Sequence, residues 1–170
     1  MKLTWFGGRT LRIHIGGEVV VWRPAAIAGL APEELLSGAD RVVTAGERLE
    51  PVEGASWRPR RTASELEAEG ARPGLRLAAL GAGVDLIEIP GEAPLLIVAG
   101  PLPAVGRWGR EAVVVAFSAA AAISALERAG PRLIALALAP EELDAAFDRL
   151  RGDLGDTGLM ALEPGLAVEV

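Results

Sequence analysis

The sequence predicts a single α/β domain in which β-sheets are covered by helices. The first part of the chain reads as short strands separated by glycine turns, and the last part alternates apolar strands with helices. No linker, repeat or low-complexity tail separates the two parts. A chain of 170 residues is long enough for one real core and short for two domains. We therefore expect one domain over residues 1–170.

The N-terminal half is expected to be rich in hairpins. Strands over residues 10–15 and 18–22 are joined by Gly16-Gly17, and glycine accepts the positive φ of a two-residue turn. Pro32-Glu33-Glu34-Leu35-Leu36 predicts a short helix that stops near Gly38. The other elements expected before residue 100 are strands over 3–6, 40–44, 75–78, 85–89 and 95–98, and a helix opened by the capping-box spacing Thr62-Ala63-Ser64-Glu65.

The C-terminal half is expected to alternate strands and helices. A fully apolar strand over 112–117 precedes Ser118, which can cap a helix over 119–129 that Gly130-Pro131 ends. The elements that follow are a buried strand over 132–138, an amphipathic helix over 140–151, and strands over 158–162 and 166–170. The order strand–helix–strand favours helices packed on the face of a sheet.

Composition excludes several classes of function. The net charge of -6 argues against nucleic acid or an anionic membrane as the main partner. The absence of cysteine excludes a disulfide framework and a thiol nucleophile. No apolar run reaches the roughly 18 residues of a membrane span, and the N-terminus enters a strand pattern directly. We therefore expect a cytoplasmic protein that binds a protein partner or itself.

His14 is the sole histidine of the chain. A dinuclear zinc site needs several imidazoles, which one histidine cannot supply, and histidine-based acid–base catalysis has only this one candidate. Leu11, Ile13 and Ile15 alternate onto an apolar face, so Arg12 and His14 are expected to point the other way, toward solvent.

Three stretches of the chain resemble one protein family. They are the opening MKLTWFGGRTLRIHIGGEVVVWRP, the segment Ala39-Asp40-Arg41-Val42-Val43-Thr44, and the closing LMALEPGLAVEV. Together they resemble the ascorbate-6-phosphate-lactonase-like branch of the metallo-β-lactamase superfamily, over nearly the whole chain and in order. The resemblance implies an αββα sandwich, here a shortened metallo-β-lactamase fold, in which bound metals activate a water for hydrolysis.

The same resemblance implies that the metal site has been lost. The family's early Gly-His falls on Gly7-Gly8, and the aspartate of its Asp-Pro falls on Arg23. The remaining ligand or signature positions fall on Ala45, Glu47, Leu49, Glu50, Pro101 and Ala137. Alanine, leucine and proline side chains give nothing to a metal, so we expect no catalytic residue, metal or cofactor. Glu47 and Glu50 would at best form a weak carboxylate site; the alternative is a solvated loop or contact surface.

Several residues remain as candidate contacts for an anion or a partner. Arg58-Pro59-Arg60-Arg61 is the densest basic cluster, and it could grip a phosphate or an acidic partner while Trp57 stacks; the alternative is a solvated loop. Trp108 is either an exposed interface anchor beside arginine or part of the core. The full set of candidate contacts is Arg23, Glu47, Arg48, Glu50, Trp57, Arg58, Arg60, Arg61 and Trp108.

Three functions are consistent with these features. The first is a non-catalytic metallo-β-lactamase-fold protein that serves as a binding, scaffold or assembly subunit. The second is a metal-independent enzyme, or a binder of small ligands or anions, that reuses the vacated cleft with Arg23, Glu47, Arg48 and Glu50 as its lining. The third is a metal-dependent hydrolase with unconventional ligands. A deep cleft with converging Arg and Glu side chains would favour the second function over the first.

Overall fold

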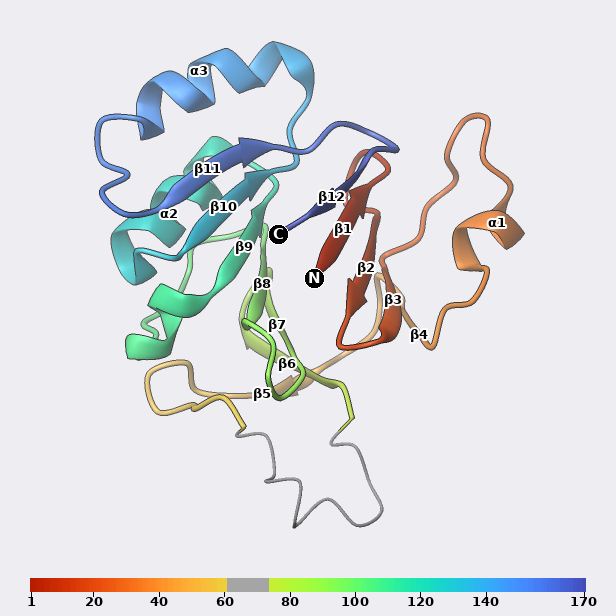
Figure 1. Cartoon of the computed structure of the whole chain (residues 1–170), viewed down its shortest axis with the longest axis horizontal. Coiled ribbons are helices and arrows are strands. Elements are labelled where there is room, and N and C mark those ends of the chain that lie inside the picture. Colours follow the sequence, from red (N-terminus) through yellow and green to blue (C-terminus); the bar gives the residue numbers. More distant parts are fainter. Residues whose placement is uncertain (61–73) are drawn as a thin grey trace.

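Two mixed β-sheets face each other in the computed structural model, which describes residues 1–60 and 74–170 (Figure 1). The five-stranded sheet has the order β12-β1-β2-β3-β4, with β1 Lys2–Trp5, β2 Leu11–Ile15, β3 Glu18–Trp22, β4 Arg41–Val43 and β12 Ala167–Glu169. The seven-stranded sheet has the order β11-β10-β9-β8-β7-β6-β5, with β5 Glu50–Pro51, β6 Arg76–Gly81, β7 Val84–Glu88, β8 Leu95–Val98, β9 Val113–Ala116, β10 Leu133–Leu136 and β11 Gly158–Ala161.

The predicted N-terminal hairpin is confirmed. β2 and β3 pair antiparallel, and Gly16 and Gly17 make the turn between them with φ of 55° and 86°. Leu11, Ile13 and Ile15 are each at most 1% exposed, as the alternation of β2 predicts. Their side chains enter a core between the two sheets, which the seven-stranded sheet supplies from strands β7, β8, β9 and β10. The hydrophobic pattern of these strands thus explains why the sheets stack face to face.

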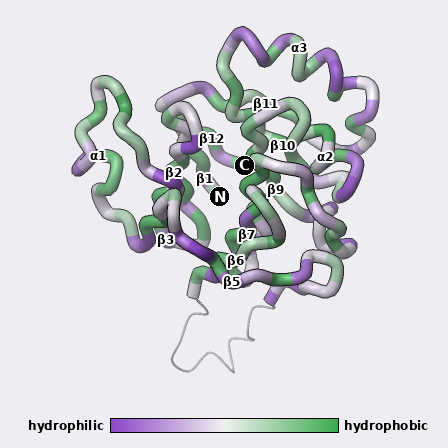
Figure 2. The backbone as a smooth tube through the Cα atoms, turned by 180° about the vertical axis from the view of Figure 1, so that it is seen from behind, coloured by the Kyte–Doolittle hydropathy of each residue, from purple (hydrophilic) through white to green (hydrophobic). Residues whose placement is uncertain are grey.

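A second core lies between the seven-stranded sheet and two helices, α2 Ala119–Ala129 and α3 Pro140–Leu150. As predicted, Ser118 caps α2 by accepting a hydrogen bond from the backbone N–H of Ala121 at 3.1 Å, and Gly130 ends the helix with a φ of 53°. α3 alternates polar and apolar stretches along the tube in Figure 2. That pattern belongs to a helix with one face in the core and the other in water.

The outer face of the five-stranded sheet carries the short helix α1 Pro32–Leu36 (Figure 1). Arg12, on that face of β2, donates hydrogen bonds to the carbonyls of Leu35 at 2.7 Å and Ser37 at 2.5 Å. Arg12 therefore does point away from the inter-sheet core, but it is half-buried beneath α1 rather than free in solvent. Helix, sheet, sheet and helices follow one another, so the α/β sandwich with few helices is confirmed.

Some elements differ from the prediction. The strand β5 and the 3-10 helix η1 Arg107–Glu111 were not expected, because two residues of strand and one tight turn carry too little periodicity to recognise. Gly81 belongs to β6, so the turn is narrower than Gly81-Ala82-Gly83. The helix expected from Thr62 lies outside the described residues. Within residues 1–60 and 74–170, no helix is both long and apolar enough to cross a membrane.

Candidate functional site

One end of the sandwich gathers the positions of interest. β1, β3 and β4 run in one direction in their sheet, and β8, β9 and β10 run parallel in theirs. Two contacts mark the end of the sandwich where these strands end. The turn from β11 into β12 meets the end of β1, where the backbone N–H of Gly165 bonds the carbonyl of Trp5 at 2.6 Å, and Arg23, after β3, pairs with Asp85 at the start of β7, beside the end of β8. We call this end the carboxyl edge; it is where α/β sheets generally bind ligands.

Five positions that the resemblance assigns to metal binding follow strands that end at the carboxyl edge. They are Gly8 after β1, Arg23 after β3, Ala45 after β4, Pro101 after β8 and Ala137 after β10. Ala137 is buried, at 4% exposure, and its backbone N–H bonds the carbonyl of Ala116 at 2.9 Å. The backbone thus brings these positions to one edge, although their side chains carry no donor except the guanidinium of Arg23.

Arg23 and Asp85 form an ion pair across the carboxyl edge. The guanidinium lies 3.7 Å from the carboxylate, and the two side chains are 27% and 12% exposed. Arg23 also lies over the ring of Trp22, 5.6 Å from its centroid. Burial raises the pKa of Asp85 above its ordinary value, and the charge of Arg23 opposes that rise. The pair therefore links the two sheets through one half-buried charge and one largely buried charge.

The backbone at Arg23 is strained. Its φ of 47° lies in the left-handed region that side chains other than glycine rarely adopt. Two hydrogen bonds hold it there: the backbone N–H of Arg23 bonds the carbonyl of Val43 at 2.7 Å, and the hydroxyl of Thr10 donates to the carbonyl of Arg23 at 3.0 Å. Strain of this kind persists where the surroundings over-determine it, often at sites that once had or still have a function.

The residues of the carboxyl edge do not fit a hydrolytic metal centre. A divalent metal needs several anionic or neutral donors, and here a single carboxylate faces a guanidinium. Across the described ranges, no three His, Cys, Asp or Glu side chains lie close enough together to hold a metal ion. The donor set and the positive charge of Arg23 both disagree with a bound cation at this edge.

The loop after β4 places Glu47, Arg48 and Glu50 away from Arg23. These three residues line an open pocket of about 510 Å³ whose other walls include Leu75 and Leu77, near the start of β6. Asp85 is close to the first residue of β7, so β7 starts at the carboxyl edge. β6 pairs antiparallel with β7 and therefore starts at the opposite end of the sandwich. The structure therefore does not bring Arg23 and the Glu47–Glu50 loop into one cleft.

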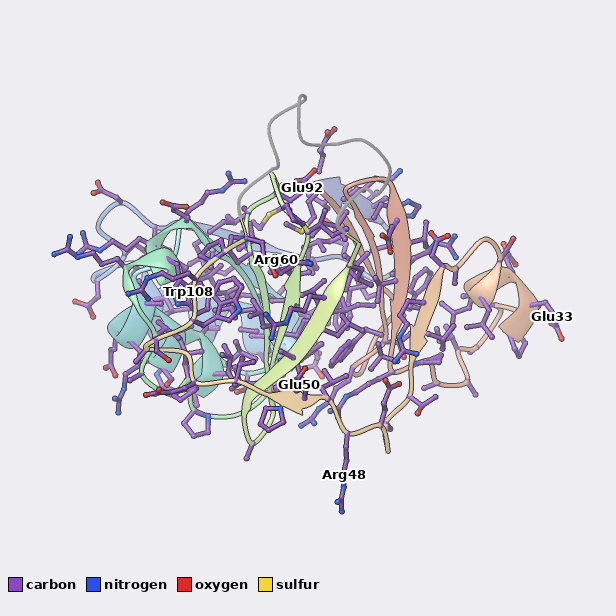
Figure 3. All side chains as sticks on the ribbon, turned by 90° about the horizontal axis from the view of Figure 1, so that it is seen from below. Glu33, Arg48, Glu50, Arg60, Glu92 and Trp108 are labelled. Carbon is purple, nitrogen blue, oxygen red and sulfur yellow. The ribbon has the colours of Figure 1, made fainter. Side chains whose placement is uncertain are left out.

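Within that loop, each side chain has its own surroundings. The carboxylate of Glu47 is paired with the guanidinium of Arg41, Leu49 packs against the inter-sheet core, and Arg48 projects away from the body of the protein (Figure 3). Glu50 is exposed and belongs to β5. Glu47 is therefore engaged by Arg41, whereas Glu50 is exposed at the edge of the seven-stranded sheet.

The two candidate tryptophans are part of the core. Trp57 and Trp108 are only 7% and 5% exposed, and their ring centroids lie 4.6 Å apart at an angle of 69°. The indole N–H of Trp108 donates to the carbonyl of Gly54 at 2.8 Å, whereas that of Trp57 has no partner among the described residues. Trp57 therefore offers no exposed stacking surface, and of the two alternatives for Trp108 the structure supports the core: both rings fill the core beside α2.

The basic cluster after Trp57 is largely used inside the chain. The carboxylate of Glu88, 1% exposed, accepts bonds from the backbone N–H of Arg60 at 2.5 Å and from its Nε at 2.8 Å. Arg58 donates to the carbonyl of Trp57 at 2.8 Å. Arg61 lies outside the described residues. Arg58 and Arg60 therefore bind groups of this chain. Glu88 is a buried acid that the sequence pattern did not single out, because it ends the mostly apolar strand β7.

His14 is poorly suited to acid–base work. It is half-buried on the outer face of β2, and its Nε2 lies 3.4 Å from the Nε of Arg12. Burial, followed by the charges of Lys2 and Arg12, lowers its pKa below the ordinary value of 6.5. The lowered pKa favours the neutral imidazole near pH 7, and the hydrogen-bond partner of its Nε2 is the cationic Arg12.

Two facing mixed sheets with helices on their outer faces make an architecture that this chain shares with solved hydrolases. The structure resembles Igni18, a novel metallo hydrolase from the hyperthermophilic archaeon Ignicoccus hospitalis KIN4/I, with a TM-score of 0.58 and 14% sequence identity over 99% of this chain and 98% of that one. It also resembles the isothiocyanate hydrolase from Delia radicum gut bacteria, with a TM-score of 0.53 and 14% identity over 99% of each chain.

At 14% identity, these likenesses concern the fold. No protein-family model and no curated protein matches the sequence. The fold-level part of the resemblance stated from the sequence is therefore confirmed: this chain has a metallo-hydrolase fold over nearly its whole length.

Proposed function

We propose that this chain is a non-catalytic relative of the metallo-β-lactamase-fold hydrolases, of the ascorbate-6-phosphate-lactonase-like branch, and that it acts as a binding, scaffold or assembly subunit. The observation that carries the proposal is the Arg23–Asp85 ion pair at the carboxyl edge. It puts a fixed positive charge where the fold's hydrolases would hold a cation, and it engages the carboxylate that lies closest to that charge.

The positive charge of Arg23 opposes the binding of a cation at the carboxyl edge. Two unit charges about 4 Å apart interact by about 4 kcal/mol at an effective dielectric constant of 20, and a divalent ion doubles that figure. Asp85 can offset only one of the two charges of such an ion. A cation entering the carboxyl edge would therefore have to displace Arg23 from Asp85, and the two backbone hydrogen bonds of Arg23 resist that movement.

Outside the carboxyl edge, the molecule keeps well-packed cores and intact helix caps. The inter-sheet core and the helix-side core are both filled with buried aliphatic and aromatic side chains, and α2 keeps its Ser118 cap and its Gly130 stop. A protein that keeps its packing but carries a guanidinium in place of a metal ligand can still act through its surface, by binding another protein or by joining an assembly as a subunit.

One observation favours a second function, a small-ligand or anion binder at the same edge. Arg23 keeps a strained backbone, and its guanidinium is 27% exposed and, within residues 1–60 and 74–170, donates no hydrogen bond. A carboxylate or phosphate ligand would use those donors. Thermal-shift measurements with simple carboxylates and phosphate distinguish the two, because only an anion binder is stabilised by them in wild type and not in Arg23→Gln.

Affinity purification of the tagged chain at its native expression level, followed by mass spectrometry of the intact assembly, tests the proposal. We expect a stoichiometric protein partner or a defined homo-oligomer, without zinc or manganese. A monomer that carries a metal, with a hydrolytic activity that a chelator abolishes, would contradict it and support a hydrolase with unconventional ligands. The same purification of Arg23→Gln is the control, since assembly through the surface does not depend on Arg23.

A further inference from the structure

Four exposed arginines gather at the end of the seven-stranded sheet where β8, β9 and β10 begin. Arg107 and Arg110 belong to η1, Arg128 to the last turn of α2, and Arg132 to the turn before β10. We call these four residues the arginine face. A Cβ added to Gly109 would come within 3.1 Å of the Cβ of Ala129, so η1 sits directly on the end of α2.

The arginine face inverts the charge of the protein locally. Residues 107–132 carry four arginines and two glutamates, a net charge of +2, whereas the whole chain carries -6. The two glutamates, Glu111 and Glu127, are exposed, and neither forms an ion pair with a described residue. Glu111 and Glu127 therefore offset half of the arginine charge without pairing with any one guanidinium among the described residues, and the segment keeps a net charge of +2.

The guanidiniums of the arginine face are unused within the fold. Arginines elsewhere that bond or pair with described residues are Arg12, Arg23, Arg41, Arg58, Arg60 and Arg151. Toward residues 1–60 and 74–170, by contrast, none of the four arginines of the face donates a hydrogen bond or forms an ion pair. Each keeps five N–H donors for a ligand, and a planar guanidinium binds carboxylates in a bidentate manner.

The face also has a recess. Arg110 and Arg132, from different elements, line a pocket of about 470 Å³ together with Gly91, Glu92 and Glu111. The carboxylate of Glu92 lies 3.9 Å from the N-terminal ammonium, which partly offsets its charge. Two guanidiniums on one recess can clasp a single carboxylate, while Arg107 and Arg128 extend the positive charge beyond it along η1 and α2.

We propose that the arginine face docks an acidic segment of a protein partner, with one carboxylate held between Arg110 and Arg132. This inference rests on the proposed assembly function and gives the chemistry of the partner. An extended acidic segment suits the face better than one phosphate, because it can place a single negative charge in the recess, whose wall also carries Glu92 and Glu111, and its other carboxylates beside Arg107 and Arg128. A phosphate would put its second charge inside the recess, against both glutamates. It also suits the face better than a nucleic acid, because Trp108, the aromatic ring of η1, is buried and cannot stack on a base.

Fluorescence anisotropy with a labelled Asp/Glu-rich peptide tests the inference on the full chain. A peptide with Asn/Gln in place of the acids and a single-stranded oligonucleotide of equal charge are the comparison probes. We expect Arg110→Glu combined with Arg132→Glu to weaken binding of the acidic peptide by at least about tenfold. The matched control combines Arg9→Glu with Arg48→Glu, two exposed arginines away from the face, and should change binding by less than about threefold.

The outcomes separate cleanly. If the two double variants lose affinity for the acidic peptide equally, net charge alone explains the loss and the proposed site is overturned. The site is also overturned if the wild-type protein does not bind the peptide at low salt. Tighter binding of the oligonucleotide would overturn the choice of an acidic protein partner. Arg110→Gln combined with Arg132→Gln, checked by its melting temperature, replaces the charge reversal if that variant does not fold.

The same variant also distinguishes this inference from the proposed function. If a stoichiometric partner still co-purifies with Arg110→Glu/Arg132→Glu, the assembly function stands and the arginine face is overturned. If the wild-type chain is isolated from its own cells without a partner and without self-association, the assembly function itself is overturned.

Discussion

Replacing Arg23 by alanine removes the partner of a largely buried acid. The carboxylate of Asp85 is 12% exposed, and its ion pair spans 3.7 Å, which is too long for a hydrogen bond, so Arg23 acts on it through charge. Removing one member of such a pair leaves a poorly solvated carboxylate. Because the pair is not fully buried, we expect Arg23→Ala to lower the free energy of unfolding by about 1–3 kcal/mol near pH 7.

The stability cost of Arg23→Ala should depend on pH, and the pKa shift of Asp85 gives the direction of that dependence. The pKa of Asp85 in the folded protein is raised above its ordinary value, chiefly by burial. The stabilisation linked to that proton is fully present below the unfolded pKa of about 4 and is lost as pH rises through the folded value. Arg23→Ala raises the folded pKa further. Its cost should therefore be largest near pH 7 and shrink as the pH falls through the folded pKa of Asp85, because a protonated carboxyl group no longer needs the charge of Arg23.

Urea unfolding of four proteins measures the effect: wild type, Arg23→Ala, Asp85→Asn and the double variant. In the Asp85→Asn background the carboxylate is absent, so Arg23→Ala should cost less than about 1 kcal/mol, the remainder being lost contact with Trp22 and a change in backbone strain. An equal cost in both backgrounds, or a cost that does not fall between pH 7 and pH 4, would refute the electrostatic reasoning.

Three further predictions concern the core, the buried acid and the histidine. Trp108→Phe removes an indole N–H whose partner lies at 2.8 Å, whereas the matched control Trp57→Phe removes an N–H without a described partner. In urea unfolding, Trp108→Phe should lower the free energy of unfolding by about 1–2 kcal/mol more than the control does, and equal losses would contradict this. Arg60→Ala removes the side-chain bond to Glu88, which is 1% exposed, and should lower the unfolding free energy by about 2–3 kcal/mol, whereas an unchanged urea midpoint would mean that water solvates the acid. NMR titration of His14 should give a pKa below 6.5, and a value above it would show that a nearby acid outweighs burial and the charges of Lys2 and Arg12.

Local patterns in the sequence predict much of the fold. The alternation of Leu11, Ile13 and Ile15, the Gly16-Gly17 turn and the Ser118 cap depend on neighbouring residues, and each is found in the structure as expected. The pairing of the two sheets follows from the apolar runs, since each must bury a face. β5 and η1 escaped prediction because they are short and are held in place by long-range contacts.

The candidate site was harder to predict because it depends on contacts between distant residues. The family resemblance implied a positive charge, Arg23, at the vacated position, but nothing local pairs it with Asp85, which is 62 residues further along the chain (85 minus 23). The clue available in the sequence was the presence of Asp85 and Glu88 in an otherwise apolar strand. The sequence did not decide whether Trp108 is an anchor or part of the core, and it did not show that Trp57 is buried, because charged neighbours in sequence do not reveal that two rings pack together.

The most direct test of the central claim is the affinity of the metal-free protein for Zn²⁺ and Mn²⁺, measured by isothermal titration in wild type and in Arg23→Asp. If Arg23 stands in place of a cation, wild type should show no stoichiometric site, and Arg23→Asp, which exchanges the guanidinium for a second carboxylate, should bind more tightly than wild type. A stoichiometric site in wild type with a dissociation constant below about 1 μM would contradict the account, because about 8 kcal/mol of binding energy for a divalent cation cannot arise where the one carboxylate, Asp85, is already paired with the guanidinium of Arg23.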